Sequence, residues 1–382
     1  MAEIKNLKKA ADRIKKAVKN QEKIILYGDA DLDGVSSVII LKETILSLGG
    51  KISAIYFPDR EKEGYGLNES ALSSLRKYAP ALLVILDCGI GNFKEIKSAK
   101  KIGFKTIIID HHEILNKIPQ ADMVVDPKQK GDKYPFKKFA TVGLAYKLSE
   151  IILGKKFFTA LKENFLELTA LATLADMMPR EEENEIFILE GLSLIEKSWR
   201  PGIKSFFEIK YLDQFLTLEQ KISKIISILN VRDVEKNFPA SFRLFTMTSK
   251  EEAKNFIKKL IKKNELRKEK INETVEEIEK RILKNEDDII FEGSFDFDFT
   301  LISPVASILC QRHKKPAFIF KKLKEESQGT VRVPAKINSV DLMGKCKDNL
   351  ITYGGHPQAS GFRVKNENLE KFKNCLIKHL KK

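Results

Sequence analysis

Length, composition and charge exclude several classes of protein. The 382 residues suffice for two domains with separate cores, and 43% hydrophobic with 32% charged residues is typical of a folded chain rather than a disordered one. No apolar run approaches the roughly 18 residues of a membrane-spanning helix, so no membrane partner is expected. The formal net charge of +15 favours a polyanionic partner such as nucleic acid, although a lysine-rich proteome would give a similar value.

The cysteines and the N-terminus indicate a reducing, cytoplasmic location. Cys88, Cys310, Cys346 and Cys375 lie far apart and form no C-x-x-C pair, which predicts neither a zinc cluster nor a disulfide framework. The first residues are charged and no apolar segment follows them, so no signal peptide is expected.

The first 130 residues or so alternate between helical and strand-like patterns. Residues 3–20 and 35–48 have the spacing of helices. Uninterrupted apolar runs, which predict strands buried on both sides, occupy residues 23–27, 52–57, 82–86, 106–109 and 123–125. Because helical stretches separate most of these runs, the pattern predicts an α/β fold with a parallel sheet and helices on both faces.

The remainder of the chain predicts a long connecting helix and a second domain. Residues 142–194 are mainly helical, and residues 250–285 are mostly charged with a narrow apolar seam. Strand-like runs and helical stretches then return, at residues 289–291, 317–320 and 329–333 and at residues 304–312 and 369–380 respectively. We therefore expect a domain over 1–248, a connecting helix over 249–286 and a smaller α/β domain over 287–382.

Acids and imidazoles follow three of the predicted strands. They occur in residues 28–34 (GDADLDG), 86–89 (LDCG) and 110–112 (DHH), and ligands bind at this edge of an open parallel sheet. Crowded carboxylates raise one another's pKa unless cations neutralise them. Bound Mn²⁺, Mg²⁺ or Zn²⁺ would supply that charge, and two such ions catalyse hydrolysis of phosphoesters.

Each piece also has a simpler explanation. An Asp-rich turn can cap a helix, and Asp87 with Gly89 can shape a turn. The neighbouring pair His111 and His112 is harder to explain in this way, because the chain has only five histidines. Taken together, the three segments favour a metal site.

These segments resemble motifs I, II and III of the DHH phosphoesterase superfamily, and residues 171–179 (LATLADMMP) resemble motif IV of its RecJ-type nucleases. The resemblance implies two Mn²⁺ or Mg²⁺ ions bridged by Asp87. The other implied ligands are Asp29, Asp31, Asp33, His111 and Asp176, and the choice among the three motif I acids stays open.

The resemblance also implies roles for the remaining residues of the DHH triplet. Asp110 would orient His111, and His112 would contact the scissile phosphate, so that Asp87, Asp110 and His112 form the catalytic set. Tyr27 stands where RecJ-like relatives often have a histidine, which implies different coordination of one ion.

A second group of motifs lies near the C-terminus. Residues 353–362 (YGGHPQASGF) resemble the GGH motif of the DHH-associated domain, and residues 305–316 (VASILCQRHKKP) resemble the RecJ-type segment before it. Alone, the paired glycines indicate a plain turn or a phosphate cradle, and an edge arginine is either solvated or phosphate-binding. The resemblance, which is to short archaeal-type members, implies substrate-binding residues Ser307, Arg312, Arg332, Gly354, Gly355 and His356.

The function expected from these motifs is that of a metal-dependent exonuclease on single-stranded DNA or RNA, acting in replication, repair or RNA processing. Single-stranded nucleic acid is the expected partner, and a replication or repair complex is a further candidate. Two alternatives stay open: a phosphodiesterase for oligonucleotides or cyclic dinucleotides, and a replisome-associated accessory protein.

Overall fold

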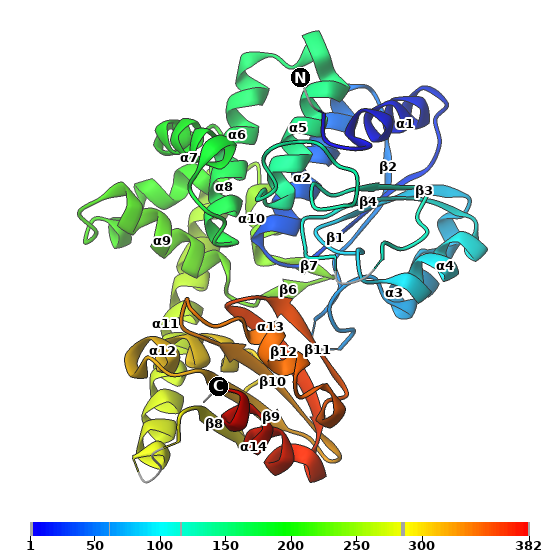
Figure 1. Cartoon of the computed structure of the whole chain (residues 1–382). Coiled ribbons are helices and arrows are strands. Elements are labelled where there is room, and N and C mark those ends of the chain that lie inside the picture. The colour runs from blue at the N-terminus through cyan, green and yellow to red at the C-terminus, as the bar shows by residue number, and fades with distance from the viewer. Residues whose placement is uncertain (1–2, 61, 115–116, 284–286, 381–382) are drawn as a thin grey trace. The chain divides into compact units, whose positions relative to one another are not determined.

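The chain forms two compact units, Met1–Lys262 and Lys263–Lys382, in a computed structural model that describes residues 3–60, 62–114, 117–283 and 287–380 (Figure 1). The first unit contains a parallel sheet with many helices, and the second contains a mixed sheet with fewer helices. In the described residues, no helix is both long enough and apolar enough to cross a membrane.

The sheet of the first unit is parallel throughout, as predicted. Its strands are β1 (Ile24–Gly28), β2 (Ile52–Tyr56), β3 (Ala81–Leu86), β4 (Phe104–Ile109) and β5 (Met123–Val125), in the order β2-β1-β3-β4-β5. The register aligns Gly28 with Leu86, Leu86 with Ile109, and Ile109 with Val125. The residues that follow these four strands therefore lie along one edge of the sheet.

Helices cover both faces of this sheet, which confirms the predicted architecture (Figure 1). Helices α1 (Leu7–Lys19), α2 (Leu32–Ser47) and α5 (Thr141–Leu153) contribute to the core on the face of Leu26. Helices α3 (Glu69–Leu75) and α4 (Phe93–Ile102) pack on the face of Tyr27. Consecutive strand residues thus enter opposite cores, because their side chains alternate in direction.

Further helices extend the first unit. They are α6 (Thr159–Ala175), α7 (Glu182–Leu194), α8 (Pro201–Lys204), α9 (Leu218–Leu229) and α10 (Ala240–Phe245), with a short hairpin of β6 (Val234–Glu235) and β7 (Phe238–Pro239). Helices α6 and α7 pack closely, because a Cβ at Gly191 would lie 2.2 Å from the carbonyl oxygen of Leu166. Helix α6 ends at Ala175, and Asp176 follows it directly.

The long predicted helix is α11 (Lys250–Ile282), which contributes to both units. Its residues Ile257 and Leu260 belong to the core of the first unit, whereas Ile271, Val275 and Ile278 belong to a core of the second. Residues 284–286, at the end of the predicted connecting segment, lie outside the described residues. The division at 1–248, 249–286 and 287–382 stays a prediction.

The second unit is the smaller α/β domain that the sequence predicts. Its strands are β8 (Ile290–Ser294), β9 (Ala317–Lys322), β10 (Glu326–Arg332), β11 (Thr352–His356) and β12 (Ala359–Lys365), in the order β11-β12-β10-β9-β8. Only β8 and β9 pair in parallel within this described sheet. Helix α12 (Ile302–His313) packs on one core, while α13 (Ser339–Gly344) and α14 (Leu369–Leu380) pack on the other.

Two local expectations for the second unit were wrong. The glycine pair expected in a turn lies in strand β11. A disulfide joins Cys346 to Cys375, 29 residues apart, although no disulfide was expected. It links the segment after α13 to α14 across a Cα–Cα distance of 6.0 Å. Because the fold brings these two cysteines together, their spacing along the chain carries no signal of the bond.

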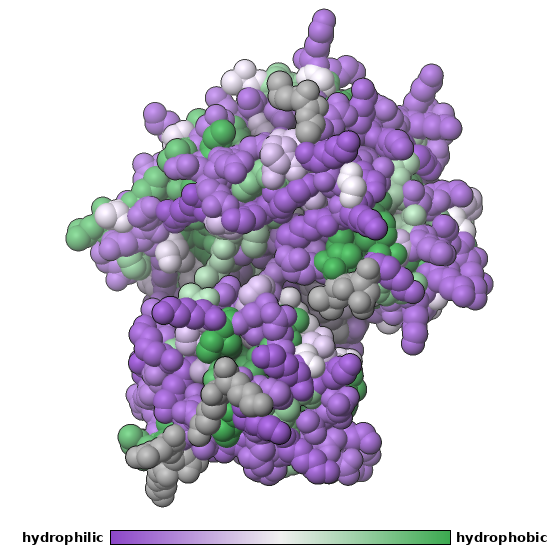
Figure 2. Space-filling model, in the orientation of Figure 1, coloured by the Kyte–Doolittle hydropathy of each residue, from purple (hydrophilic) through white to green (hydrophobic). Residues whose placement is uncertain are grey.

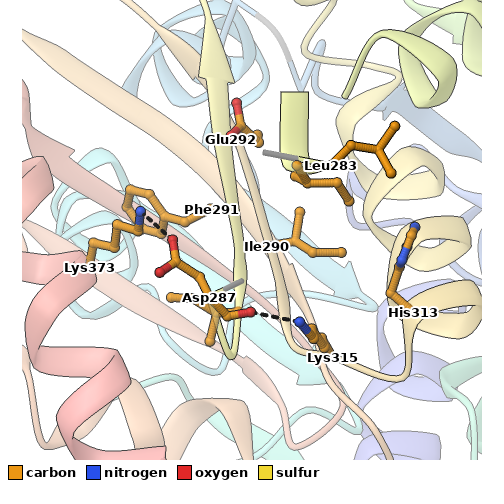
Figure 3. A pocket seen from close by; sticks show the side chains of 10 residues that line it. Leu283, Asp287, Ile290, Phe291, Glu292, His313, Lys315 and Lys373 are labelled. Atoms are coloured by element: carbon orange, nitrogen blue, oxygen red, sulfur yellow. Dashed lines mark hydrogen bonds and ion pairs between the residues drawn. The ribbon is translucent and has the colours of Figure 1, made fainter. Parts of the chain in front are cut away.

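A cavity of about 120 Å³ opens beside β8, between the end of α11 and the start of α14 (Figure 3). Its two lysines are already engaged, since Lys315 donates to the carbonyl oxygen of Asp287 at 2.8 Å and Lys373 pairs with the Asp287 carboxylate at 2.7 Å. The cavity lining contains none of the predicted site residues, so we look for the site elsewhere.

Candidate active site

A row of four acids follows the strands of the first sheet. Asp29, Asp87, Asp110 and Asp126 come directly after β1, β3, β4 and β5, and each is at most 1% exposed. The backbone N–H of Asp87 donates to Ile109 at 3.0 Å, which extends the strand pairing one residue further. The register of the sheet therefore brings these carboxylates to one edge, and Asp126 joins a row in which the sequence predicted only three members.

The other two motif I acids lie at the start of α2. Asp31 caps this helix by accepting from the N–H of Gly34 at 3.0 Å. Asp33 accepts from the N–H groups of Thr141 and Val142 at 2.7 and 2.8 Å, in the first turn of α5. The positive end of a second helix thus holds Asp33 in place. Asp31 and Asp33 therefore accept hydrogen bonds at the starts of helices and also belong to the acidic cluster.

His111 connects these acids to the end of α6. Its Nε2 lies 3.5 Å from Asp87 Oδ1, 3.4 Å from Asp176 Oδ2 and 3.9 Å from Asp33 Oδ2. Ligand atoms lie within 4.8 Å of one another in three groups of residues that could hold a metal ion: Asp33 with His111 and Asp176, Asp29 with Asp31 and Asp87, and Asp87 with His111 and His112. The fold thus brings together all the predicted metal ligands.

The cluster carries more acid than a buried site can ionise without added positive charge. Burial and neighbouring carboxylates raise the pKa of Asp33 to about 7 and that of Asp176 to about 8. The same causes raise the pKa of Asp87 well above its usual range. Carboxylate oxygens with one imidazole form a donor set that suits Mn²⁺ or Mg²⁺, so the residues present fit divalent cations.

Asp110 supports its neighbours. Its Oδ1 accepts from the backbone N–H groups of His111 and His112 at 2.8 and 3.2 Å and lies 2.8 Å from His112 Nδ1, while its Oδ2 accepts from the N–H of Ile90 at 3.0 Å. Burial lowers the pKa of His112, but the Asp110 carboxylate outweighs it and raises that pKa to about 9. The Asp110 carboxylate thus contacts the backbone of His111 and the ring of His112, and its orientation of the His111 ring stays a prediction.

Tyr27 lies outside the ligand groups. Its hydroxyl donates to the carbonyl oxygen of Gly66 at 2.7 Å, and its ring stacks on Tyr56 with centroids 5.5 Å apart. It belongs to the core on the α3 and α4 face and to none of the three groups of possible ligands. Its contacts support the segment around Gly66, and different metal coordination at this position stays a prediction.

Two residues that the sequence analysis missed, Arg60 and Tyr65, reach the acids from the segment after β2. Arg60 forms ion pairs with Asp29 and Asp31. The Tyr65 hydroxyl donates to the carbonyl oxygen of Asp87 at 3.1 Å and lies 3.3 Å from both ring nitrogens of His112. The segment that holds them, residues 57–66 (FPDREKEGYG), follows a strand that ends at the same edge, and its charged residues were the available signal.

A second polar cluster lies at one end of the C-terminal sheet. Arg332 ends β10 and His356 ends β11, and both pair with Ala359 of β12. The Arg332 guanidinium donates to the hydroxyls of Ser307, Thr330 and Ser303 at 3.1, 3.0 and 2.5 Å. Within the described part of the chain no carboxylate forms an ion pair with Arg332, so its charge stays available to an anion.

The other predicted substrate residues divide into two groups. Gly355 has φ +133°, and a Cβ there would lie 2.6 Å from Ser360 Cα, whereas nothing lies within 4 Å of a Cβ built on Gly354. Gly354 therefore leaves open space beside β11. Arg312 is not brought to this cluster, because at the far end of α12 its guanidinium bonds Glu279 of α11 at 3.2 Å.

Comparison with known proteins agrees with this geometry. Residues 23–173 match the model of the DHH family, N-terminal domain. Over 98% of its length, which includes this domain, the chain is 34% identical to the single-stranded-DNA-specific exonuclease RecJ of Bacillus subtilis (strain 168). The alignment covers 48% of the length of that relative. The chain is 28% identical over 94% of its length to the RecJ of Thermus thermophilus, of which it covers 52%.

The chain thus spans about half the length of these curated relatives. A crystal structure of exonuclease RecJ bound to manganese superposes with a TM-score of 0.78 at 24% identity, covering 99% of this chain and 94% of that one. The predicted resemblance to RecJ-like proteins and the predicted fold are confirmed. These two curated relatives are bacterial, and the resemblance to the short archaeal type stays a prediction.

Proposed function

We propose that this chain is a metal-dependent phosphodiesterase that acts as an exonuclease on single-stranded DNA or RNA. The observation that carries this proposal is the position of Asp87, whose carboxylate belongs to two groups of possible metal ligands at once. A carboxylate shared in this way suits a pair of ions rather than one. Similarity to RecJ exonucleases over 98% of the chain supports the same reaction.

In this proposal Asp33, His111 and Asp176 would hold one Mn²⁺ or Mg²⁺, and Asp29 and Asp31 would hold the other. Asp87 would serve both ions, because it belongs to one group with Asp29 and Asp31 and to another with His111. When bound, the ions activate water and stabilise negative charge that develops on the phosphoryl group. The protein contributes rigid carboxylates: Asp33 is fixed by two backbone N–H groups of α5, and Asp87 accepts from the Thr141 hydroxyl at 3.1 Å.

His112 is the proposed contact to the scissile phosphate. Its side chain is 27% exposed, so part of the ring reaches solvent while Asp110 holds Nδ1. With a pKa of about 9, the imidazolium carries a positive charge at neutral pH. A charged donor of this kind binds a phosphate oxygen more strongly than a neutral one.

The C-terminal cluster is the proposed site for a phosphate of the bound strand. Arg332 supplies the charge, Ser307 and His356 supply polar side chains, and Gly354 lets the strand approach the backbone of β11. Gly355 contributes by allowing β11 to lie close to Ser360 of β12. We leave Arg312 out of this set, because its guanidinium already pairs with Glu279.

The net charge of +15 suits sequence-independent binding of a nucleic-acid backbone. Similarity to single-stranded-DNA-specific exonucleases supports a single-stranded substrate. The visible face of each unit is covered mainly by hydrophilic side chains (Figure 2). We propose that the protein acts in the cytoplasm, in replication, repair or RNA processing, where a replication or repair complex is a further candidate partner.

End-labelled single strands test the reaction directly. With Mn²⁺ present, we expect stepwise loss of nucleotides from single-stranded DNA or RNA, little loss from blunt duplex, and none in EDTA or with His111→Ala. Unchanged degradation by His111→Ala would contradict the proposal, and 5′ and 3′ labels in the same assay give the polarity.

The same assay separates the alternatives. A rate that peaks at two to five nucleotides or on a cyclic dinucleotide would favour the oligonucleotide phosphodiesterase. Absence of hydrolysis with every strand length and both ions, in a folded preparation, would favour the accessory protein.

A further inference from the structure

Arg60 occupies one of the possible metal groups. Its Nε donates to Asp29 Oδ1 at 2.8 Å, and its Nη2 bonds both Asp29 Oδ2 and, at 2.8 Å, Asp31 Oδ2. Asp29 and Asp31 are two members of the group that Asp87 completes. A guanidinium therefore already pairs with two of the three carboxylates that would hold the second ion and offsets one of their negative charges.

The first group differs in this respect. Among the described residues, no lysine or arginine forms an ion pair with Asp33 or Asp176, whose recorded ionic partner is the imidazole of His111. Asp87 belongs to the group of Asp29 and Asp31, and its Oδ1 lies 3.5 Å from the His111 Nε2 of the other group. The two groups are therefore adjacent but face different competition for a cation. A guanidinium and a divalent ion on the same carboxylates repel each other strongly in a partly buried site.

We propose that Arg60 is a built-in counter-ion of Asp29 and Asp31, and that the second ion must displace its guanidinium in order to bind. This inference rests on the proposed metal-dependent function and deepens it. The two ions then bind unequally: the Asp33, His111 and Asp176 group fills first, and the Asp29, Asp31 and Asp87 group fills at a higher concentration of metal.

The surroundings of Arg60 allow such a displacement. Its side chain is 44% exposed, whereas that of Asp29 is 1% exposed, so the guanidinium can leave towards solvent while the carboxylate stays. Arg60 follows β2, outside the regular elements, and its guanidinium carbon lies 5.6 Å from the ring centre of Tyr65. This contact forms in the same position in which the guanidinium bonds Asp29 and Asp31, so its loss would accompany the displacement.

Manganese binding measured without substrate tests the inference. In titrations followed by electron paramagnetic resonance, wild type should bind two Mn²⁺ with unequal affinity. Arg60→Gln should tighten the weaker site by about tenfold or more, because its competitor is gone, and change the tighter site by less than about twofold. The melting temperature of Arg60→Gln in EDTA should fall below that of wild type, and saturating Mn²⁺ should remove the difference.

Arg363→Gln is the matched control. Arg363 donates three hydrogen bonds to the Glu326 carboxylate, and its side chain is 47% exposed, close to the value for Arg60. Because Glu326 belongs to no metal group, both manganese affinities should stay at the wild-type values. An equal change in this control would assign the effect to general charge and overturn the inference.

Two further results decide between the inference and the function beneath it. If wild type binds two Mn²⁺ and Arg60→Gln leaves the weaker site unchanged or weakens it, the inference fails and the function stands. If wild type binds one ion or none, both the inference and the proposed two-metal function fail. Crystals of wild type grown in EDTA and in Mn²⁺ need no variant: a guanidinium that still bonds Asp29 and Asp31 beside a second ion overturns the displacement.

Discussion

The polar edges of the two sheets carry opposite charges. In the first unit the residues after the strands are acids at most 1% exposed, and burial raises the pKa of several of them. In the second unit Arg332 and His356 end the two strands that flank β12, and the Arg332 guanidinium contacts hydroxyls. The first edge holds an excess of acids and the second presents a cation, so one suits metal ions and the other suits a phosphate.

The two edges also differ in how much folding stability the protein loses when no ligand is bound. Buried carboxylates without a counter-ion repel one another and lose stability, whereas an arginine among hydroxyls is satisfied by neutral partners. Arg60 fits this contrast, because it supplies positive charge to the acids of the first edge. Four substitutions test the contrast, in order of decreasing expected effect on activity.

Asp87→Asn should have the largest effect. Its carboxylate belongs to two metal groups, so we expect kcat/KM to fall on the order of 10³-fold or more as several kcal/mol of charge stabilisation are lost. Single-turnover assays in Mn²⁺ measure the loss. Asp341→Asn, in the exposed first turn of α13, is the control and should stay within about twofold of wild type. A loss below tenfold for Asp87→Asn would mean that no shared ligand is needed.

Asp110→Asn should distinguish a residue that positions His112 from a residue that binds metal. Its carboxylate holds the ring of His112 and accepts backbone N–H groups, so the substitution should lower kcat by about 10–100-fold. The number of bound Mn²⁺ ions should stay the same, because Asp110 belongs to no metal group. Loss of an ion in this variant would place Asp110 among the ligands and remove the distinction.

Strand ends of the first unit could be predicted because the information is local. Each apolar run ends in an acid, and parallel pairing alone brings Asp29, Asp87 and Asp110 to one edge. The contacts of Arg60 could not be predicted in this way, since they depend on β2 lying beside β1 and on the path of the chain beyond it. Non-local neighbours of this kind leave no periodic pattern in the sequence.

The errors in the second unit have similar causes. Strand β11 contains two glycines, which are uncommon in strands, and it was therefore interpreted as a turn. Arg312 follows Ser307 by only five residues in α12, yet the two side chains have different partners. Arg312, at the C-terminal end of the helix, bonds Glu279, whereas Ser307 bonds Arg332. Closeness in sequence could not show which partner each side chain of α12 contacts.

Arg332→Gln probes the cationic edge. Loss of a charged hydrogen bond to phosphate costs about 1.5–3 kcal/mol, which predicts a rise in KM of roughly tenfold or more and a smaller change in kcat. Arg312→Gln is matched in chemistry and should change KM by less than about twofold, because its guanidinium pairs with Glu279. Equal effects of the two substitutions would contradict a special role for the end of β10.

Asp126→Asn should barely change activity but should alter the dependence of stability on pH. Burial raises the pKa of Asp126 from 3.8 to about 7, and its Oδ2 has no hydrogen-bond partner among the described residues. Between about pH 4 and 7 the folded state keeps a proton that the unfolded chain loses, so stability falls as pH rises through this window.

Asparagine resembles the protonated acid and removes that loss, which is on the order of a few kcal/mol. Measured in EDTA, the free energy of unfolding of Asp126→Asn relative to wild type should therefore increase from pH 5 to pH 8. A difference that is constant with pH would show that Asp126 ionises freely. The expected increase in the free energy of unfolding would show that Asp126 stays protonated in the folded state, unlike the acids of the edge that we propose bind cations.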